Sequence, residues 1–153
     1  MAGNGELHSL NLADGEDVAP PVAFGYPNGK SYALNLWNNI VFTTTSQGCA
    51  GNPNQMWAID LNDPLKKVMT FSPRSGGLWG RQGAAIDSTG TAWAPTGDGV
   101  YDLANQRYGN GLIAAKVEGK ELNNPRLEVE GFLRSRRDKT DHEWFIDPSG
   151  LSS

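Results

Sequence analysis

Short runs of alternating hydrophobic and polar residues recur along this chain, and helical periodicity is almost absent. Turn-forming pairs such as Asp14-Gly15, Asn38-Asn39 and Glu118-Gly119 separate successive runs, and such pairs tolerate the positive φ angles that tight hairpins need. Because alternation with a period of two is typical of strands, the pattern predicts an antiparallel all-β protein. We expect hairpins at residues 6–24, 31–45, 55–71, 83–96 and 112–132.

The hairpins also repeat. The sequences LHSLNL, MWAIDL and LIAAKV begin at positions 7, 56 and 112 and occupy equivalent places. A repeat of about 40–50 residues that holds four strands is typical of a β-propeller blade. We therefore predict an incomplete, antiparallel propeller within residues 1–132. Its parts are a half blade at 6–24 and full blades at 31–71 and 82–132.

An incomplete propeller needs a partner, because a propeller closes with about four to eight blades. Uncovered sheet edges and blade faces favour pairing with other chains. We expect the partner to be either the remaining blades of a longer protein or another copy of this chain.

Residues 133–153 fit the repeat poorly and form a basic and polar tail. The tail is interpreted either as the start of a next blade or as a disordered end. Its basic residues could bind an anion or could belong to a solvated linker, and the sequence leaves both open. These residues are Arg134, Arg136, Arg137 and Lys139.

Composition narrows the classes of partner. The net charge of −4 and the pI of about 5.1 provide no broad basic surface for nucleic acid. No apolar run reaches the roughly 18 residues that a membrane span needs, and the N-terminus lacks the features of a signal peptide. Cys49 is the single cysteine, which excludes an intrachain disulfide and a cysteine-based zinc site.

The longest connections should lie together on one face of the blades, since up-and-down strands place alternate connections on the same side. These are residues 25–30, 46–54, 72–81 and 97–111. Long loops on a rigid scaffold often carry binding sites, so we predict a small-molecule or protein ligand on this face. The ligand-face candidates are Cys49, Asn52, Trp79, Arg81, Asp98 and Tyr101. Asn54, Arg74, Asp102, Arg107 and Tyr108 map to the same face.

Trp79 and Arg81 allow two interpretations. The indole could stack on a planar ligand while the guanidinium binds an anion. Alternatively, Trp79 could wedge between blades while Arg81 pairs with Asp98. Asp98 is otherwise expected to stabilise its turn by accepting backbone N–H bonds, and Cys49 to be a small buried residue.

No catalytic constellation is evident in the sequence. His8 and His142 have no His, Cys or carboxylate partner at metal-ligand spacing, and no metal site is predicted. P-loop and G-x-S-x-G motifs are absent. Whether the protein is an enzyme therefore stays open.

Three segments resemble the repeats of quinoprotein-like (pyrroloquinoline-quinone-like) β-propeller proteins of bacteria. They are GCAGNPNQMWAIDL, GGLWGRQGAAIDSTGTAWAPTGDGVYD and YGNGLIAAKV, and the resemblance spans roughly residues 6–117. It implies a binding or scaffold segment of a larger exported protein, periplasmic or secreted. The alternative is part of a quinone-dependent alcohol or sugar dehydrogenase whose cofactor residues lie outside this chain.

Quinone and Ca²⁺ would then be cofactors of the full-length parent. The chain departs from the dehydrogenase pattern at Cys49, which is flanked by Gly48 and Ala50 and so lacks the adjacent cysteine that such enzymes typically carry.

Overall fold

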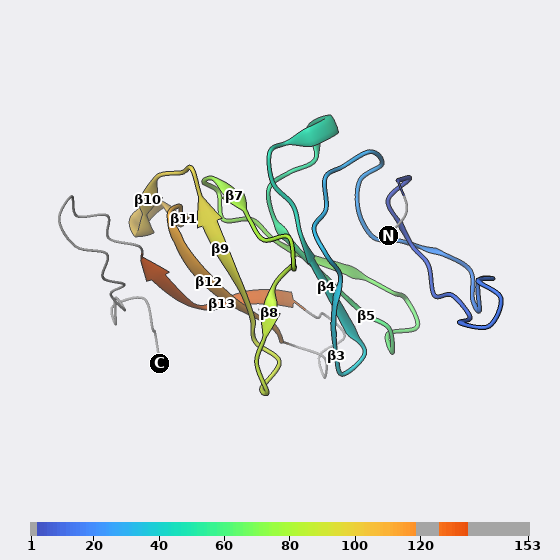
Figure 1. Cartoon of the computed structure of the whole chain (residues 1–153). Coiled ribbons are helices and arrows are strands. Elements are labelled where there is room, and N and C mark those ends of the chain that lie inside the picture. The colour runs from blue at the N-terminus through green and yellow to red at the C-terminus, as the bar shows by residue number, and fades with distance from the viewer. Residues whose placement is uncertain (1–2, 119–125, 135–153) are drawn as a thin grey trace.

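A computed structural model describes residues 3–118 and 126–134, the latter as backbone only (Figure 1). Strands dominate it, and every strand pair is antiparallel. The helices in the described part are two single-turn 3-10 helices, η1 (Cys49–Gly51) and η2 (Leu103–Asn105). No helix of these residues has the length and apolar character needed to cross a membrane. The predicted all-β, antiparallel class is confirmed.

Three of the four sheets follow one another along the chain, and the fourth is a two-stranded hairpin within residues 97–111. The N-terminal sheet pairs β1 (Glu6–Leu7) with β2 (Val22–Ala23). The middle sheet has its strands in chain order: β3 (Asn35–Trp37), β4 (Ile40–Thr44), β5 (Met56–Asp60) and β6 (Val68–Phe71). The C-terminal sheet runs β13 (Arg126–Arg134), β12 (Gly111–Glu118), β9 (Ala92–Gly97) and β7 (Gly77–Leu78), with β8 (Ala85–Ile86) also paired to β9.

The register of the middle sheet sorts its side chains onto two faces. Residues directly opposite one another on neighbouring strands point to the same side, and adjacent positions along a strand point to opposite sides. One row consists of Leu36, Val41, Ile59 and Val68. The next row, on the other face, consists of Asn35, Phe42, Ala58 and Met69. Both faces of this sheet are therefore mostly apolar.

Each face of the middle sheet packs against a different neighbour. The face of Phe42 and Ala58 forms one core with buried residues of the C-terminal sheet, among them Ala92 and Ile113. The opposite face forms a second core, in which Val41, Trp57 and Ile59 pack against Leu7 and Phe24 of the N-terminal segment. The middle sheet is thus the central layer of three.

Long and short connections lie at opposite ends of the strands. Figure 1 shows η1, β7 and the small hairpin of β10 (Tyr101–Asp102) and β11 (Arg107–Tyr108) at the top. The turns β3–β4 and β8–β9 lie at the bottom. We call the upper connections, residues 25–30, 46–54, 72–81 and 97–111, the long-loop face.

Two of these loops contain strands that the sequence did not predict. Residues 72–81 include β7, which pairs with β9 through Gly77↔Gly97 and Leu78↔Thr96 and inserts the fully buried Leu78 into the core. Residues 97–111 include β10 and β11. Each of these strands is two residues long, too short to show an alternating pattern.

The sheets of residues 3–118 and 126–134 form neither a closed barrel nor a closed propeller. The predicted blade boundaries and the closure of a ring therefore stay predictions. The predicted tail lies, except for the backbone of residues 133–134, outside the described residues.

Asp87 organises the turn between β8 and β9. Its carboxylate accepts bonds from the backbone N–H groups of Thr89 (2.9 Å) and Thr91 (3.1 Å), from the Thr89 hydroxyl (2.7 Å) and from Trp93 Nε1 (3.0 Å). Hydrogen bonds to the ionised form, led by that from Trp93, hold the pKa of Asp87 well below its usual range. One side chain thus closes the turn and fixes the indole of the next strand.

Asp87→Asn should lower the melting temperature at neutral pH, because an amide cannot accept all four bonds. A depressed carboxyl pKa stabilises the fold above the unfolded value of 3.8, and this contribution is lost as the pH falls through the lower folded value. The melting temperature of the wild type should therefore fall more steeply below pH 4 than that of Asp87→Asn. Thermal unfolding followed by circular dichroism from pH 7 to pH 2 measures this.

Asp98→Asn is the matched control, because the Asp98 carboxylate accepts no hydrogen bond from any described residue. Equal pH profiles for Asp87→Asn and the wild type would contradict the assignment.

Candidate functional site

The long-loop face is fastened by close backbone contacts at glycines. A Cβ atom at Gly76 would overlap the carbonyl oxygen of Gly97, and one at Gly109 would overlap the backbone of Gly99. Asn54 adds a bond across sheets, since its Nδ2 donates to the Gly76 carbonyl at 3.0 Å. Loops from the middle and C-terminal sheets therefore form one packed seam, in which Gly76 and Gly109 have no room for a Cβ atom.

Trp79 lies in this seam directly after β7. Its backbone N–H donates to the Pro95 carbonyl at 3.0 Å, and its indole covers two glycines: a Cβ atom at Gly97 would lie 3.0 Å from Nε1, and one at Gly77 3.2 Å. The half-buried side chain has its Nε1 buried without a hydrogen-bond partner. The ring fills space beside two glycines of the C-terminal sheet, and the predicted wedge between blades stays a prediction.

Arg81 and Asp98 do not form the pair that the structural interpretation expected. Both side chains are exposed, and neither makes a hydrogen bond or ion pair with another described residue. Asp98 has a left-handed backbone (φ 55°), and its carboxylate accepts no backbone N–H bond from the described residues. Asp102 performs that role instead by accepting from the backbone and side chain of Asn105, which lowers the pKa of Asp102.

The other predicted site residues are embedded in local structure. Cys49 begins η1 and is half-buried. Asn52 is 2% exposed, with its Oδ1 unpartnered and its Nδ2 closely packed against Gly29. Tyr101 pairs with Tyr108 in the β10–β11 hairpin and packs against the core. Cys49 and Tyr101 belong to different local elements, and the ligand-face assignments stay predictions.

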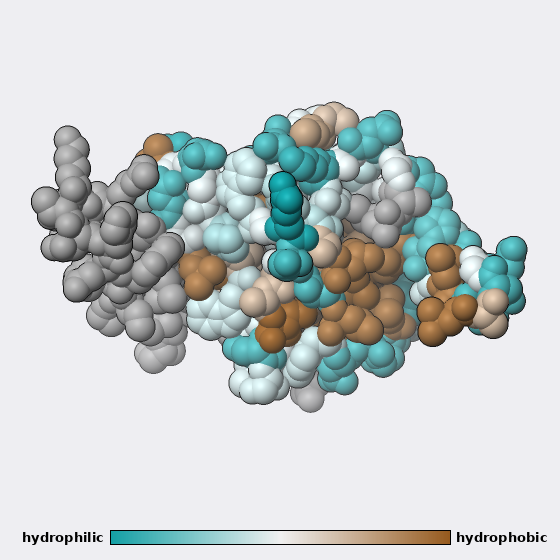
Figure 2. All heavy atoms as spheres, in the orientation of Figure 1, coloured by the Kyte–Doolittle hydropathy of each residue, from teal (hydrophilic) through white to brown (hydrophobic). Residues whose placement is uncertain are grey.

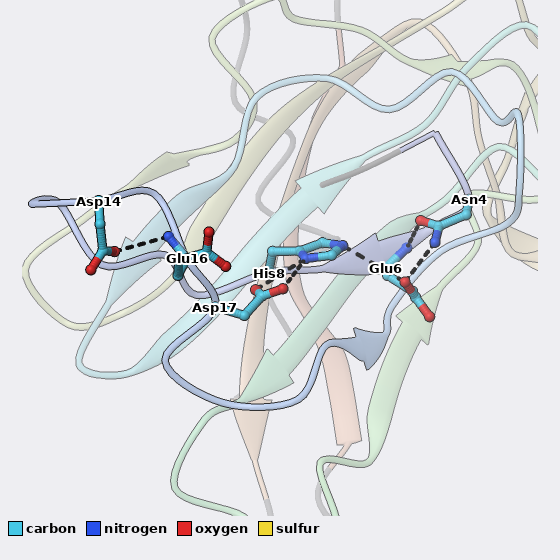
Figure 3. Close-up of polar contacts among 6 residues, drawn as sticks. All are labelled: Asn4, Glu6, His8, Asp14, Glu16 and Asp17. Carbon is cyan, nitrogen blue, oxygen red and sulfur yellow. Dashed lines mark hydrogen bonds and ion pairs between the residues drawn. The ribbon is translucent and has the colours of Figure 1, made fainter.

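A histidine that the sequence left without a partner has two. Nδ1 of His8 lies 3.0 and 3.1 Å from the carboxylate oxygens of Asp17, and Nε2 lies 3.7 Å from Glu6 Oε2 (Figure 3). Glu6 is two residues away on the same strand face. Asp17 returns through the hairpin, where a bridge joins Leu10 to Asp17. No role was predicted for His8 from the sequence, and its contact with Asp17 could not be read from sequence spacing, because the two residues meet only across the hairpin.

The contacts of this cluster point to no nucleophile and to no metal ligand set among the described residues. Carboxylates face both ring nitrogens of His8, and no hydroxyl or thiol of the described residues hydrogen bonds to the ring. Residues 3–118 and 126–134 contain no group of three His, Cys, Asp or Glu side chains suited to a metal ion. Figure 3 shows instead an exposed acidic hairpin, in which Asp14 and Glu16 accompany the histidine cluster.

Exposed apolar side chains occur on the N-terminal segment and on and beside β3. Figure 2 shows hydrophobic areas at the right, where Figure 1 has the N-terminal segment, and nearer the middle of the molecule. Their exposed fractions range from 39% at Leu34 to 104% at Leu12. We call this surface the N-terminal face, formed by Leu10, Leu12, Val18, Leu34 and Leu36. The sequence could not identify it, because its residues alternate as those of a covered strand would.

Comparison with known proteins identified three similar curated proteins. They come from Shewanella sp. strains ANA-3, MR-7 and MR-4, and each is named Protein Syd. Each is 28% identical to this chain over 134 residues, which covers 82% of this chain. The chain spans 59% of the length of these relatives. No family model and no solved structure matches.

The resemblance to quinoprotein-like propellers was wrong. The relatives bear the name Protein Syd, and no quinoprotein or propeller family is among the matches. The predicted scaffold function and the dehydrogenase alternative both depended on that resemblance, so both are wrong. The expectations of a quinone cofactor and of oxidoreductase activity are withdrawn for the same reason. Short Gly-rich turns between alternating strands occur in many β proteins, so they did not identify a family. Export to the periplasm stays an untested prediction.

Trp79→Ala should cost about 2–4 kcal/mol of unfolding free energy, because it empties the space beside Gly77 and Gly97. Trp79→Phe should cost less than about 1.5 kcal/mol, because it retains an aromatic ring and Nε1 has no bond to lose. Urea denaturation measures both. Equal losses for the two variants would show that the ring does not act by packing.

Proposed function

We propose that this chain is an assembly module, which associates with another copy of itself through the N-terminal face. The proposal rests on one observation: the N-terminal sheet covers only part of the apolar face of the middle sheet. A two-stranded sheet lies over a four-stranded one, and the apolar row of the middle sheet is covered only in part.

The boundary of the covered area runs along this row. Val41 and Ile59 are 7% and 0% exposed beneath the N-terminal segment, and Val68 also packs into that core. Leu36, the next member of the same row, is 64% exposed, and Leu34, one residue before β3, is 39% exposed. Leu36 is therefore a direct continuation of an existing sheet-to-sheet interface.

Strands from a second copy would complete this layer. β1 and β2 pair only with each other among the described strands, so each has an outer edge to which no described strand is paired. An added strand gains main-chain hydrogen bonds at such an edge, and its side chains can cover the exposed leucines. Burying a leucine side chain contributes about 1.5–3 kcal/mol, so Leu34 and Leu36 together provide a substantial part of a binding energy.

The arrangement of the sheets supports association with a similar unit. Three sheets from consecutive segments already pack face to face within one chain, as successive blades of a propeller do. A second copy would extend the same series, and a closed ring of several copies is the propeller-like form of this proposal. The name of the relatives states no partner, and the chain spans only part of their length.

Leu36→Lys should weaken self-association at least about tenfold in dissociation constant, because a charge would have to be desolvated at the interface. Sedimentation velocity over a range of concentrations measures this. The melting temperature should change little, since Leu36 is already exposed.

Leu65→Lys is the matched control, since Leu65 is 85% exposed but lies on the β5–β6 turn, outside the N-terminal face. A wild-type chain that remains monomeric at high concentration would refute the proposal. Equal association of Leu36→Lys and Leu65→Lys would do so too.

A further inference from the structure

We infer that the segment received by the N-terminal face is the basic stretch Arg134–Lys139 of a neighbouring copy. This inference rests on the proposed self-association. It goes further by naming the contact and its direction: the copies associate head to tail.

Charge is divided unevenly along the chain. Residues 1–29 contain four acidic residues and no lysine or arginine, whereas the other 124 residues contain 13 acidic and 13 basic residues. The whole net charge of −4 therefore belongs to the N-terminal segment. Four of the six residues of Arg134–Lys139 are basic, which makes this stretch the densest positive charge of the sequence.

The acidic groups lie beside the exposed leucines. Asp14 and Glu16 lie in the turn of the hairpin that bears Leu10 and Leu12, and the Glu16 side chain is exposed. A surface that combines apolar and acidic groups fits a strand end followed by arginines, because guanidinium groups bind carboxylates with two parallel hydrogen bonds. The exposed leucines of the N-terminal face thus form the binding surface, and its acidic residues favour a basic segment as the one that binds there.

The two complementary segments begin at opposite ends of the molecule. In Figure 1 the N-terminal segment lies at the right, and β13, which ends at Arg134, points to the left. The contact is therefore most direct between two copies. Because the two surfaces differ, the interface is heterologous, and repetition of it produces a ring or an open chain of copies rather than a closed symmetric dimer.

Charge reversal on the full-length chain tests the inference. The double variant Arg136→Glu/Arg137→Glu should weaken self-association at least about tenfold, as should raising NaCl from 50 to 500 mM, which shortens the screening length to a few ångströms. Arg74→Glu/Arg81→Glu is the matched control, with the same charge change at two exposed positions of the long-loop face. It should associate like the wild type.

A second measurement is the association between two different variants that are mixed with each other. Arg136→Glu/Arg137→Glu should regain affinity for Glu16→Arg, since each variant presents the charge that the other lacks. If Arg136→Glu/Arg137→Glu associates like the wild type while Leu36→Lys does not associate, the basic segment is not the occupant, although the proposed function stands. If both double variants lose association equally, net charge rather than a specific contact is responsible and the inference is overturned.

Discussion

The rest of the structure depends on the burial of the middle sheet on both faces. Strands β4 and β5 are buried at every position, so each successive residue must pack against a different neighbour. Phe42 and Ala58 hold the C-terminal sheet, while Val41 and Ile59 hold the N-terminal segment. Loss of either core would expose a continuous apolar row, and no sheet of the described chain could stay in place without this central layer.

The parts of the fold that could be predicted are those that local sequence patterns determine. Alternating runs and tight turns determine strands locally, and the all-β class followed from them. Asp14-Gly15 and Asn38-Asn39 indicated real turns, and both Asn38 and Asn39 have positive φ angles. β7 escaped notice because Gly77 and Leu78 are stabilised by pairing with Gly97 and Thr96, about twenty residues away, rather than by a local pattern.

The candidate sites were less predictable, since they depend on which residues meet across strands. His8 and Asp17 are nine positions apart and become neighbours only when the hairpin folds. Trp79 was a candidate from its sequence context, but the glycines that its indole covers come together only in the folded sheet. Leu34 and Leu36 are ordinary strand residues in sequence, and only the extent of the layer above them reveals that they are exposed.

The glycine seam of the long-loop face has a consequence for how this surface can change during evolution. At Gly76 and Gly109 every other amino acid brings a side-chain carbon into a neighbouring backbone, so substitution would push two loops apart at once. Loops usually vary freely among related proteins, whereas here the close contacts leave room for substitution mainly at exposed positions such as Arg74, Arg81 and Asp98. New binding specificity on this face would therefore arise from substitution of exposed side chains, while the loop backbones keep their conformation.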